Sequence, residues 1–186
     1  GGPGSPAYLF AASKHHSLCN QPLTGWFGHA RPFDFEPSFE AATGIRQFIC
    51  GTQPILSLRA LKIGLEVYQN IDLYQIRKKS IALTQLFIHL LEKELTSWNL
   101  KICSPLDVNE RGSQVSIHHP HAFAIMQALI EIGVIGDFRD PDLMRFGFAP
   151  LYLSFQDVQK TVEILKHILE NEVWNQEKFF KKVTVT

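Results

Sequence analysis

The sequence lacks an excess of charge of either sign, because its 186 residues hold 18 lysines and arginines against 18 aspartates and glutamates. A balanced chain has no electrostatic reason to bind nucleic acid or an anionic membrane surface. The chain also lacks any apolar run near the ~20 residues that a helix needs to cross a bilayer. With 45% hydrophobic residues, it is too apolar to be disordered. We therefore expect a folded chain that binds neither nucleic acid nor membrane.

Cysteine is scarce, with three widely spaced residues at Cys19, Cys50 and Cys103. An odd number of distant cysteines indicates neither a disulfide framework nor a cysteine-based metal site. A reducing, cytoplasmic setting is therefore expected. The eight histidines do not suggest a metal site either. His118 and His119 adjoin on a predicted strand, where neighbouring side chains point to opposite faces. No cysteine or carboxylate recurs nearby at ligand spacing, so no metal is expected.

Several catalytic motifs are absent as well. The chain has no Gly-x-Ser-x-Gly nucleophile elbow and no glycine-rich phosphate loop of either common type. Cys50 stands beside Phe48 and Ile49, a setting more typical of a buried core thiol than of a nucleophile. The residues alone therefore indicate no catalytic group.

Glycine, proline and phenylalanine are frequent in the first 55 residues, and the many glycines and prolines argue against long helices there. The short apolar stretch 7–11 predicts a buried strand. The remaining aromatic side chains must pack somewhere, so the segment is read as ordered loop and not as a flexible linker.

Helical spacing begins at Ser57. Leu58, Leu61, Leu65 and Tyr68 share one helical face. After a break at 70–72, in which Asp72 is a plausible N-cap, the same spacing continues to about residue 95. These helices are predicted to bridge two lobes.

The last ninety residues alternate strand and helix, which predicts a small α/β sandwich with helices on one side of a sheet. The predicted strands are 100–103, 114–118, 134–138 and 143–148. The predicted helices are 122–132, ending at Gly133 as the C′ residue, and one capped by Ser154 with Asp157 completing a weak capping box. Its apolar face is formed by Val158, Val162, Leu165 and Leu169.

Two residues could bind an anion. Thr52 follows Gly51 just before a predicted helix, where free N–H groups and a hydroxyl can hold an anion, or where Thr52 can simply be the N-cap. Arg145 lies among apolar neighbours on a strand, so its charge needs a partner, either a ligand or a structural carboxylate. The residues alone leave both alternatives open.

The chain contains Gly-Trp-Phe-Gly-His at 25–29, Cys-Gly-Thr at 50–52 within the segment 44–58, and Arg-Gly-Ser-Gln-Val-Ser at 111–116. Together with the segments 77–84, 124–129, 133–139 and 143–152, these blocks closely resemble the kynureninases, a family of pyridoxal-phosphate enzymes. The Gly-Thr turn recurs in related enzymes such as cysteine desulfurases, whereas the blocks around Trp26 and Arg111 do not. The resemblance runs from Gly1 to about Leu169 and concerns the C-terminal half of the family.

The resemblance implies a fold-type-I architecture. Residues 1–56 would be the end of the large cofactor-binding domain, 57–95 the bridging helices and 96–186 the small C-terminal α/β domain. In the family, the lysine that forms the Schiff base comes shortly before Gly-Gly-Pro-Gly. Because the chain starts at Gly1, that lysine is expected to lie outside it, and no catalytic residue is expected within it.

The resemblance also implies roles for individual residues. Trp26 and Thr52 would contact the phosphate of pyridoxal 5′-phosphate, reaching the site of the neighbouring subunit of a homodimer. Arg145 would grip the α-carboxylate of the substrate, L-kynurenine or its 3-hydroxy form, on the route from tryptophan towards NAD. Two alternatives stay open: another fold-type-I enzyme, such as a cysteine desulfurase or class V aminotransferase, and an autonomous, non-enzymatic interaction domain.

Overall fold

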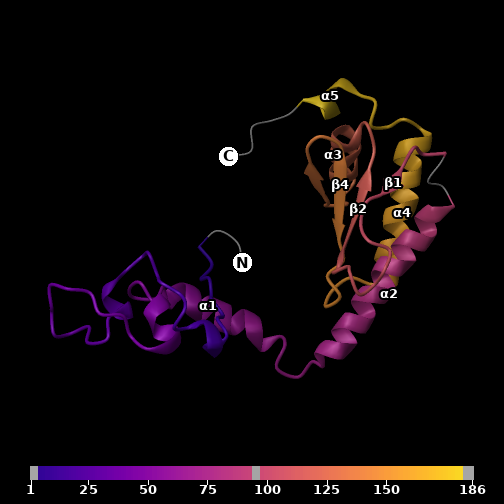
Figure 1. Ribbon diagram of the computed structural model, residues 1–186. Coiled ribbons are helices and arrows are strands. Elements are labelled where there is room, and N and C mark those ends of the chain that lie inside the picture. The colour runs from indigo at the N-terminus through magenta and orange to yellow at the C-terminus, as the bar shows by residue number, and fades with distance from the viewer. Residues whose placement is uncertain (1–3, 94–96, 182–186) are drawn as a thin grey trace. The chain divides into compact units, whose positions relative to one another are not determined.

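The computed structural model describes residues 4–93 and 97–181 (Figure 1). The chain divides into two compact units, Gly1–Asn70 and Ile71–Thr186, and each is considered by itself. Across the described residues, no helix combines the length and apolar character needed to cross a membrane. Residue 95, the predicted end of the second helix, lies outside the described ranges.

The first unit consists of loops, short 3₁₀ turns and one helix. Its elements are η1 (Ser13–His15), η2 (Trp26–Gly28), η3 (Gly44–Phe48) and α1 (Ile55–Glu66). An antiparallel bridge joins His29 to Ala41 and closes the loop between them. The loop-rich prediction for this segment agrees with these elements.

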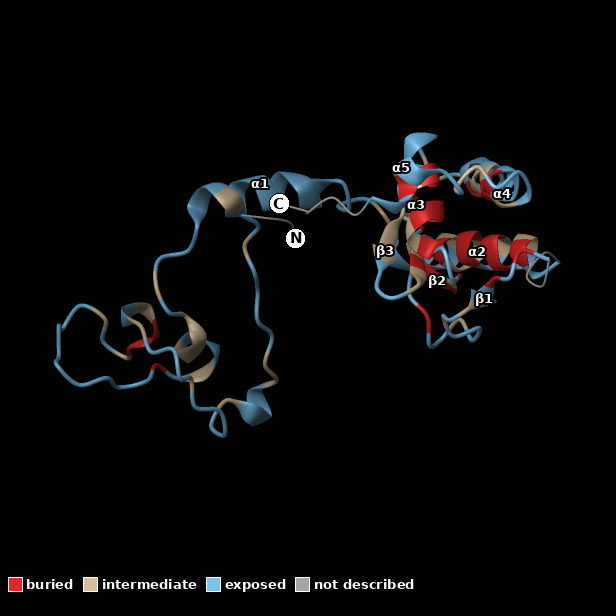
Figure 2. Ribbon diagram, turned by 90° about the horizontal axis from the view of Figure 1, so that it is seen from above, coloured by how far each residue is buried: buried red, intermediate tan, exposed pale blue. Residues whose placement is uncertain are grey.

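Two predictions about strand pairing and burial in the first unit are wrong. Residues 7–11 do not form a strand, and Tyr8 is 94% exposed. A strand needs a neighbour for its backbone N–H and C=O groups, and no described segment pairs with this one. The Cys50 thiol is also exposed, although apolar neighbours suggested a core position. Helix α1 likewise buries none of its side chains within the unit, and Figure 2 colours it almost entirely as exposed.

The predicted break between the helices is present. Helix α2 (Leu73–Glu92) begins after Asp72, whose side chain accepts a hydrogen bond from the Tyr74 N–H at 2.9 Å. Asp72 is therefore the N-cap that the sequence indicated. Unlike α1, helix α2 buries one face from Ser80 onwards, and this face includes Leu83 and Phe87.

The second unit is built on a four-stranded antiparallel sheet. Its strands are β1 (Lys101–Ile102), β2 (Gln114–His118), β3 (Asp137–Arg139) and β4 (Leu143–Gly147), in the order β1-β2-β4-β3. The helices are α2, α3 (Ala122–Glu131), α4 (Phe155–Glu170) and the short α5 (Glu177–Phe180). The mixed α/β prediction for this part of the chain is confirmed.

Alternation along the strands separates the sheet into two faces. Ile117 on β2, Met144 on β4 and Phe138 on β3 lie in one row across the sheet. This face joins the buried core with helices α2, α3 and α4, each of which has stretches coloured as buried in Figure 2. The next row, Ser116 and Arg145 with Asp137, lies on the opposite face. The register therefore puts polar side chains together on the face away from the core.

Helix ends in this unit follow the sequence signals. Ser154 accepts from the Asp157 N–H at 3.2 Å, and Asp157 accepts from the Ser154 N–H at 2.7 Å, which completes the capping box. Gly133, at φ +93°, ends α3 in the left-handed conformation that glycine permits. On α4, Ile168 is buried where Leu169 was predicted, and Leu169 packs at the edge of the core.

The predicted strand 134–138 is shorter and later than expected. Only Asp137–Arg139 pairs with β4. Val134–Gly136 instead forms the connection from α3, and a side chain at Gly136 would meet the Met126 thioether at 2.6–2.8 Å. The connection therefore packs closely against α3 before the strand begins.

Two arginines shape the connection between β1 and β2. Arg77 of α2 donates to the carbonyl oxygens of Val108 and Arg111, the latter at 2.9 Å. The buried Arg111 donates to those of Pro105 and Leu106 at 2.6 and 3.1 Å. The Arg111 block therefore serves to fix a loop against α2.

His119 is a buried base at the end of β2, 6% exposed. Its Nδ1 accepts a hydrogen bond from the His121 N–H at 3.0 Å, so the neutral ring carries its proton on Nε2. Burial, followed by repulsion from His121 and His118, lowers the pKa of His119 from 6.5 to about 4. The folded chain therefore prefers neutral His119, whereas the unfolded chain protonates it below pH 6.5.

This preference predicts a pH-dependent stability. The contribution of His119 is present above pH 6.5 and is lost as the pH falls towards 4, because only the unfolded state takes up the proton readily. From pH 7 to pH 4.5 the free energy of unfolding should fall by about 2 kcal/mol through this residue. Urea unfolding of the wild type and of His119→Asn, which keeps an acceptor but cannot titrate, measures the difference. Equal slopes with pH would contradict the assignment.

Candidate functional site

The segments of Trp26 and Thr52 lie against each other in the first unit. A side chain at Gly25 would overlap the carbonyl oxygen of Cys50 and lie 2.8 Å from its Cα, so only glycine allows this approach. The Trp26 Nε1 lies 3.9 Å from the position that a Cβ of Gly51 would occupy. The fold thus brings an indole N–H donor beside the Gly-Thr turn.

Thr52 does not cap the following helix. The N-cap of α1 is Pro54, and no side-chain hydrogen bond caps it. Within the described residues, the Thr52 hydroxyl has no hydrogen-bond partner. The interpretation of Thr52 as an ordinary N-cap is therefore wrong, and both its hydroxyl and the first N–H groups of α1 stay available.

These donors suit an anionic oxygen. An indole N–H only donates, a threonine hydroxyl can donate, and the uncapped start of a twelve-residue helix favours negative charge. The set fits the phosphate of pyridoxal phosphate, the cofactor that the family resemblance implies. Of the two interpretations of Thr52, N-cap and anion-binding turn, only the anion-binding turn is therefore still consistent with the structure.

Two cavities flank this pair of segments. Trp26 lines one of about 460 Å³, together with His29 and Phe39 of the following loop. Thr52 lines another of about 520 Å³, with Tyr8 and Phe48. His29 is buried and fixes the first loop, since its Nδ1 accepts from the Arg31 N–H and its Nε2 donates to the Ser38 carbonyl at 3.1 Å. Sequence reasoning missed this role of His29, whose only signal was its place in the Trp26 block.

Arg145 lies on β4 of the second unit, on the sheet face away from the core. Its side chain is 29% exposed. Its Nε donates to Asp137 Oδ2 at 3.0 Å, and its Nη2 donates to the same oxygen. Hydrogen bonding from Arg145 is the main cause that lowers the pKa of Asp137, so the carboxylate stays ionised. The sequence left open whether the partner of Arg145 is a ligand or a structural carboxylate. The structure contains such a carboxylate, that of Asp137.

Asp137 was not singled out from the sequence. It is the first residue of β3, and nothing near it in the sequence indicates a special role. Only the register between β3 and β4 pairs it with Arg145. Trp26 and Thr52 thus come together in one unit, while Arg145 belongs to the other with Asp137 and Arg139.

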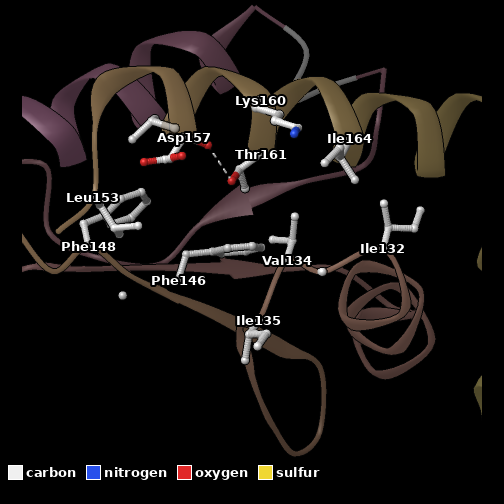
Figure 3. Close-up of a pocket in the computed structure, with 13 residues that line it drawn as sticks. Ile132, Val134, Ile135, Phe146, Phe148, Leu153, Asp157, Lys160, Thr161 and Ile164 are labelled. Atoms are coloured by element: carbon white, nitrogen blue, oxygen red, sulfur yellow. Dashed lines mark hydrogen bonds between the residues drawn. The ribbon is translucent and has the colours of Figure 1, made fainter.

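A further cavity of about 300 Å³ lies in the second unit between α4 and β4. Figure 3 shows Phe146, Phe148 and Val134 along its floor, with Lys160 and Thr161 of α4 opposite. The Thr161 hydroxyl is engaged by the carbonyl of Asp157 at 2.8 Å. None of the predicted site residues lines this cavity.

A family model of the kynureninase C-terminal domain matches residues 76–165. Kynureninases from Burkholderia mallei (strain SAVP1) and Pseudomonas fluorescens are 47% and 46% identical over all 186 residues. The chain spans 45% of the length of each of these relatives.

Solved structures share the fold at low sequence identity. A cysteine desulfurase from Thermococcus onnurineus NA1 has a TM-score of 0.70 at 15% identity, covering 85% of this chain and 41% of that one. The cystine C–S lyase C-DES, in complex with cysteine persulfide, has a TM-score of 0.66 at 15% identity, covering 84% and 41%. At this identity the likeness concerns the fold alone.

Proposed function

The chain belongs to the kynureninase family, and from this premise we propose that the complete protein carrying it is a kynureninase. It would hydrolyse L-kynurenine, or 3-hydroxykynurenine, to anthranilate, or 3-hydroxyanthranilate, and L-alanine in tryptophan catabolism. The identity of 47% to a relative over the whole chain carries this proposal. The donor set around Trp26 and Thr52 supports it, because a phosphate needs such donors.

Each site residue then has a defined task. Trp26 and Thr52 donate to the cofactor phosphate, in the site of the neighbouring subunit of a homodimer. Arg145 binds the substrate α-carboxylate, which its planar, permanently charged fork matches better than lysine does. Pyridoxal phosphate, when bound, supplies an electron sink for the cleavage of a carbon–carbon bond. The residues of this chain anchor and orient, while the covalent and acid–base groups come from outside these 186 residues.

In the proposed kynureninase, residues 1–56 are the end of the large domain, 57–95 the bridging helices and 96–186 the small domain. A cytoplasmic setting is proposed from the scarcity of cysteine.

An activity assay on the complete protein tests the function. We expect release of anthranilate from L-kynurenine and no alanine from L-cysteine, which separates a kynureninase from a cysteine desulfurase. The 186-residue chain by itself should release no anthranilate and give no Schiff-base absorbance with pyridoxal phosphate. Turnover of cysteine in place of kynurenine would overturn the proposal, and a Schiff base on the isolated chain would overturn the location of the lysine.

Removal of single phosphate donors predicts a loss of cofactor affinity. Trp26→Phe keeps an aromatic ring without the N–H, and Thr52→Val keeps the shape without the hydroxyl. Each should weaken pyridoxal-phosphate binding by roughly tenfold, since a hydrogen bond to a charged group contributes about 1.5 kcal/mol or more. Thr52→Asn restores a donor and serves as the matched control. Titration of the apoenzyme by absorbance measures the dissociation constants, and unchanged values for both variants would contradict the phosphate assignment.

A further inference from the structure

Asp137 and Arg145 face each other directly across the β3–β4 ladder. Residues paired in this way point to the same face of the sheet, here the face away from the core. Asp137 Oδ2 accepts from Arg145 Nε at 3.0 Å and also from Nη2. Arg139 Nη2 lies 3.1 Å from the same oxygen.

The hydrogen bonds occupy only one edge of the Arg145 guanidinium. A guanidinium has a side edge, formed by Nε and one Nη, and an end edge, formed by Nη1 and Nη2. Asp137 holds the side edge. Within the described residues, Nη1 has no partner, so the end edge keeps the geometry that binds a carboxylate with two parallel hydrogen bonds.

The charges of the cluster leave room for a second anion. Two guanidinium groups, Arg139 and Arg145, share the single carboxylate of Asp137. The three side chains together carry a formal charge of +1. A carboxylate arriving at the end edge of Arg145 therefore meets an attractive field although Arg145 is already paired.

We propose that Asp137 is a positioning residue, which holds the side edge of Arg145 so that the end edge is presented to the α-carboxylate of the substrate. The inference rests on the proposed function, since it assigns the ligand of the same arginine. A free arginine side chain samples several rotamers, and fixing it in advance removes part of the entropy cost of binding.

The opposite arrangement would make Asp137 a competitor that occupies Arg145 until substrate displaces it. A competitor would be expected on the end edge, where the ligand binds, and Asp137 is on the side edge. The two arrangements predict opposite changes of KM, so kinetics separates them.

The test uses the complete holoenzyme with kynurenine as substrate. Asp137→Ala should raise KM at least tenfold and change kcat less than threefold, because an interaction made equally in ground and transition states acts on KM. Asp137→Asn keeps a hydrogen-bond acceptor, so its KM should lie between those of the wild type and of Asp137→Ala. Asp142→Ala, which removes a carboxylate paired with His118 in the same hairpin, is the matched control and should keep the wild-type KM.

A double-variant cycle excludes a merely structural role. In the Arg145→Ala background, Asp137→Ala should change kcat/KM less than twofold, because its target is gone. A KM within twofold of wild type or below it in Asp137→Ala, or an equal loss in both backgrounds, would overturn the positioning role. Failure of the proposed function looks different, since the wild type would then not turn over kynurenine or Arg145→Ala would keep full activity.

Discussion

Arg145→Ala in the complete protein is expected to lower kcat/KM for L-kynurenine by two to three orders of magnitude. The variant removes the only permanent charge assigned to the substrate carboxylate. Charged hydrogen bonds of this kind contribute about 3 to 4 kcal/mol when one partner is truncated, which corresponds to a factor of roughly 10²–10³. Steady-state kinetics with anthranilate fluorescence as the signal measures the loss.

Two further variants make this result specific. Arg145→Lys keeps the charge but not the planar fork, so most of the loss should remain. Lys166→Ala removes an exposed cation of α4 that pairs with Glu170, and its kcat/KM should match the wild type. A near-wild-type value for Arg145→Ala would remove this residue from the site, while pyridoxal-phosphate binding should be unchanged in all three variants.

Gly25→Ala is expected to weaken pyridoxal-phosphate binding at least a hundredfold. The added methyl group would overlap the backbone of Cys50, so the segments of Trp26 and Thr52 must separate. Both proposed phosphate donors are then lost together, and two hydrogen bonds to a charged group amount to about 3 kcal/mol or more. Titration of the apoenzyme measures the dissociation constant.

Gly64→Ala is the matched control in the same unit. It lies within α1, and a methyl group there would meet no atom within 4 Å. Alanine also favours a helix over glycine by about 1 kcal/mol, so the control should fold at least as well as wild type. If Gly25→Ala bound the cofactor within threefold of this control, the close approach would not be what forms the phosphate site.

Local signals in the sequence predicted much of the second unit. Asp72 and Ser154 cap helices because their short side chains reach backbone N–H groups two or three residues ahead, a contact that needs no distant partner. Strand 114–118 was recognised because the apolar Val115 and Ile117 alternate with polar residues along the chain. Strand 134–138 was misplaced, since only Asp137–Arg139 pairs with β4 and this register depends on a partner strand.

The first unit was predicted less well for the same reason. The apolar stretch at 7–11 has strand composition, but no described segment supplies the backbone partner that a strand requires. Cys50 has apolar neighbours along the chain and nevertheless an exposed thiol, because burial depends on what surrounds a side chain in space.

The sequence by itself determined the family, through blocks of residues that resemble it, and it predicted Trp26, Thr52 and Arg145 as site residues. Thr52 and Arg145 were also indicated by their own side-chain chemistry, whereas Trp26 was predicted from the resemblance alone. Only the tertiary structure decided how these groups are held. The glycine contact at Cys50 joins Trp26 to the Gly-Thr turn, and the β3–β4 register gives Arg145 the carboxylate of Asp137. Both contacts join segments whose local sequences do not indicate that they pair. Such pairing is fixed only by the tertiary structure.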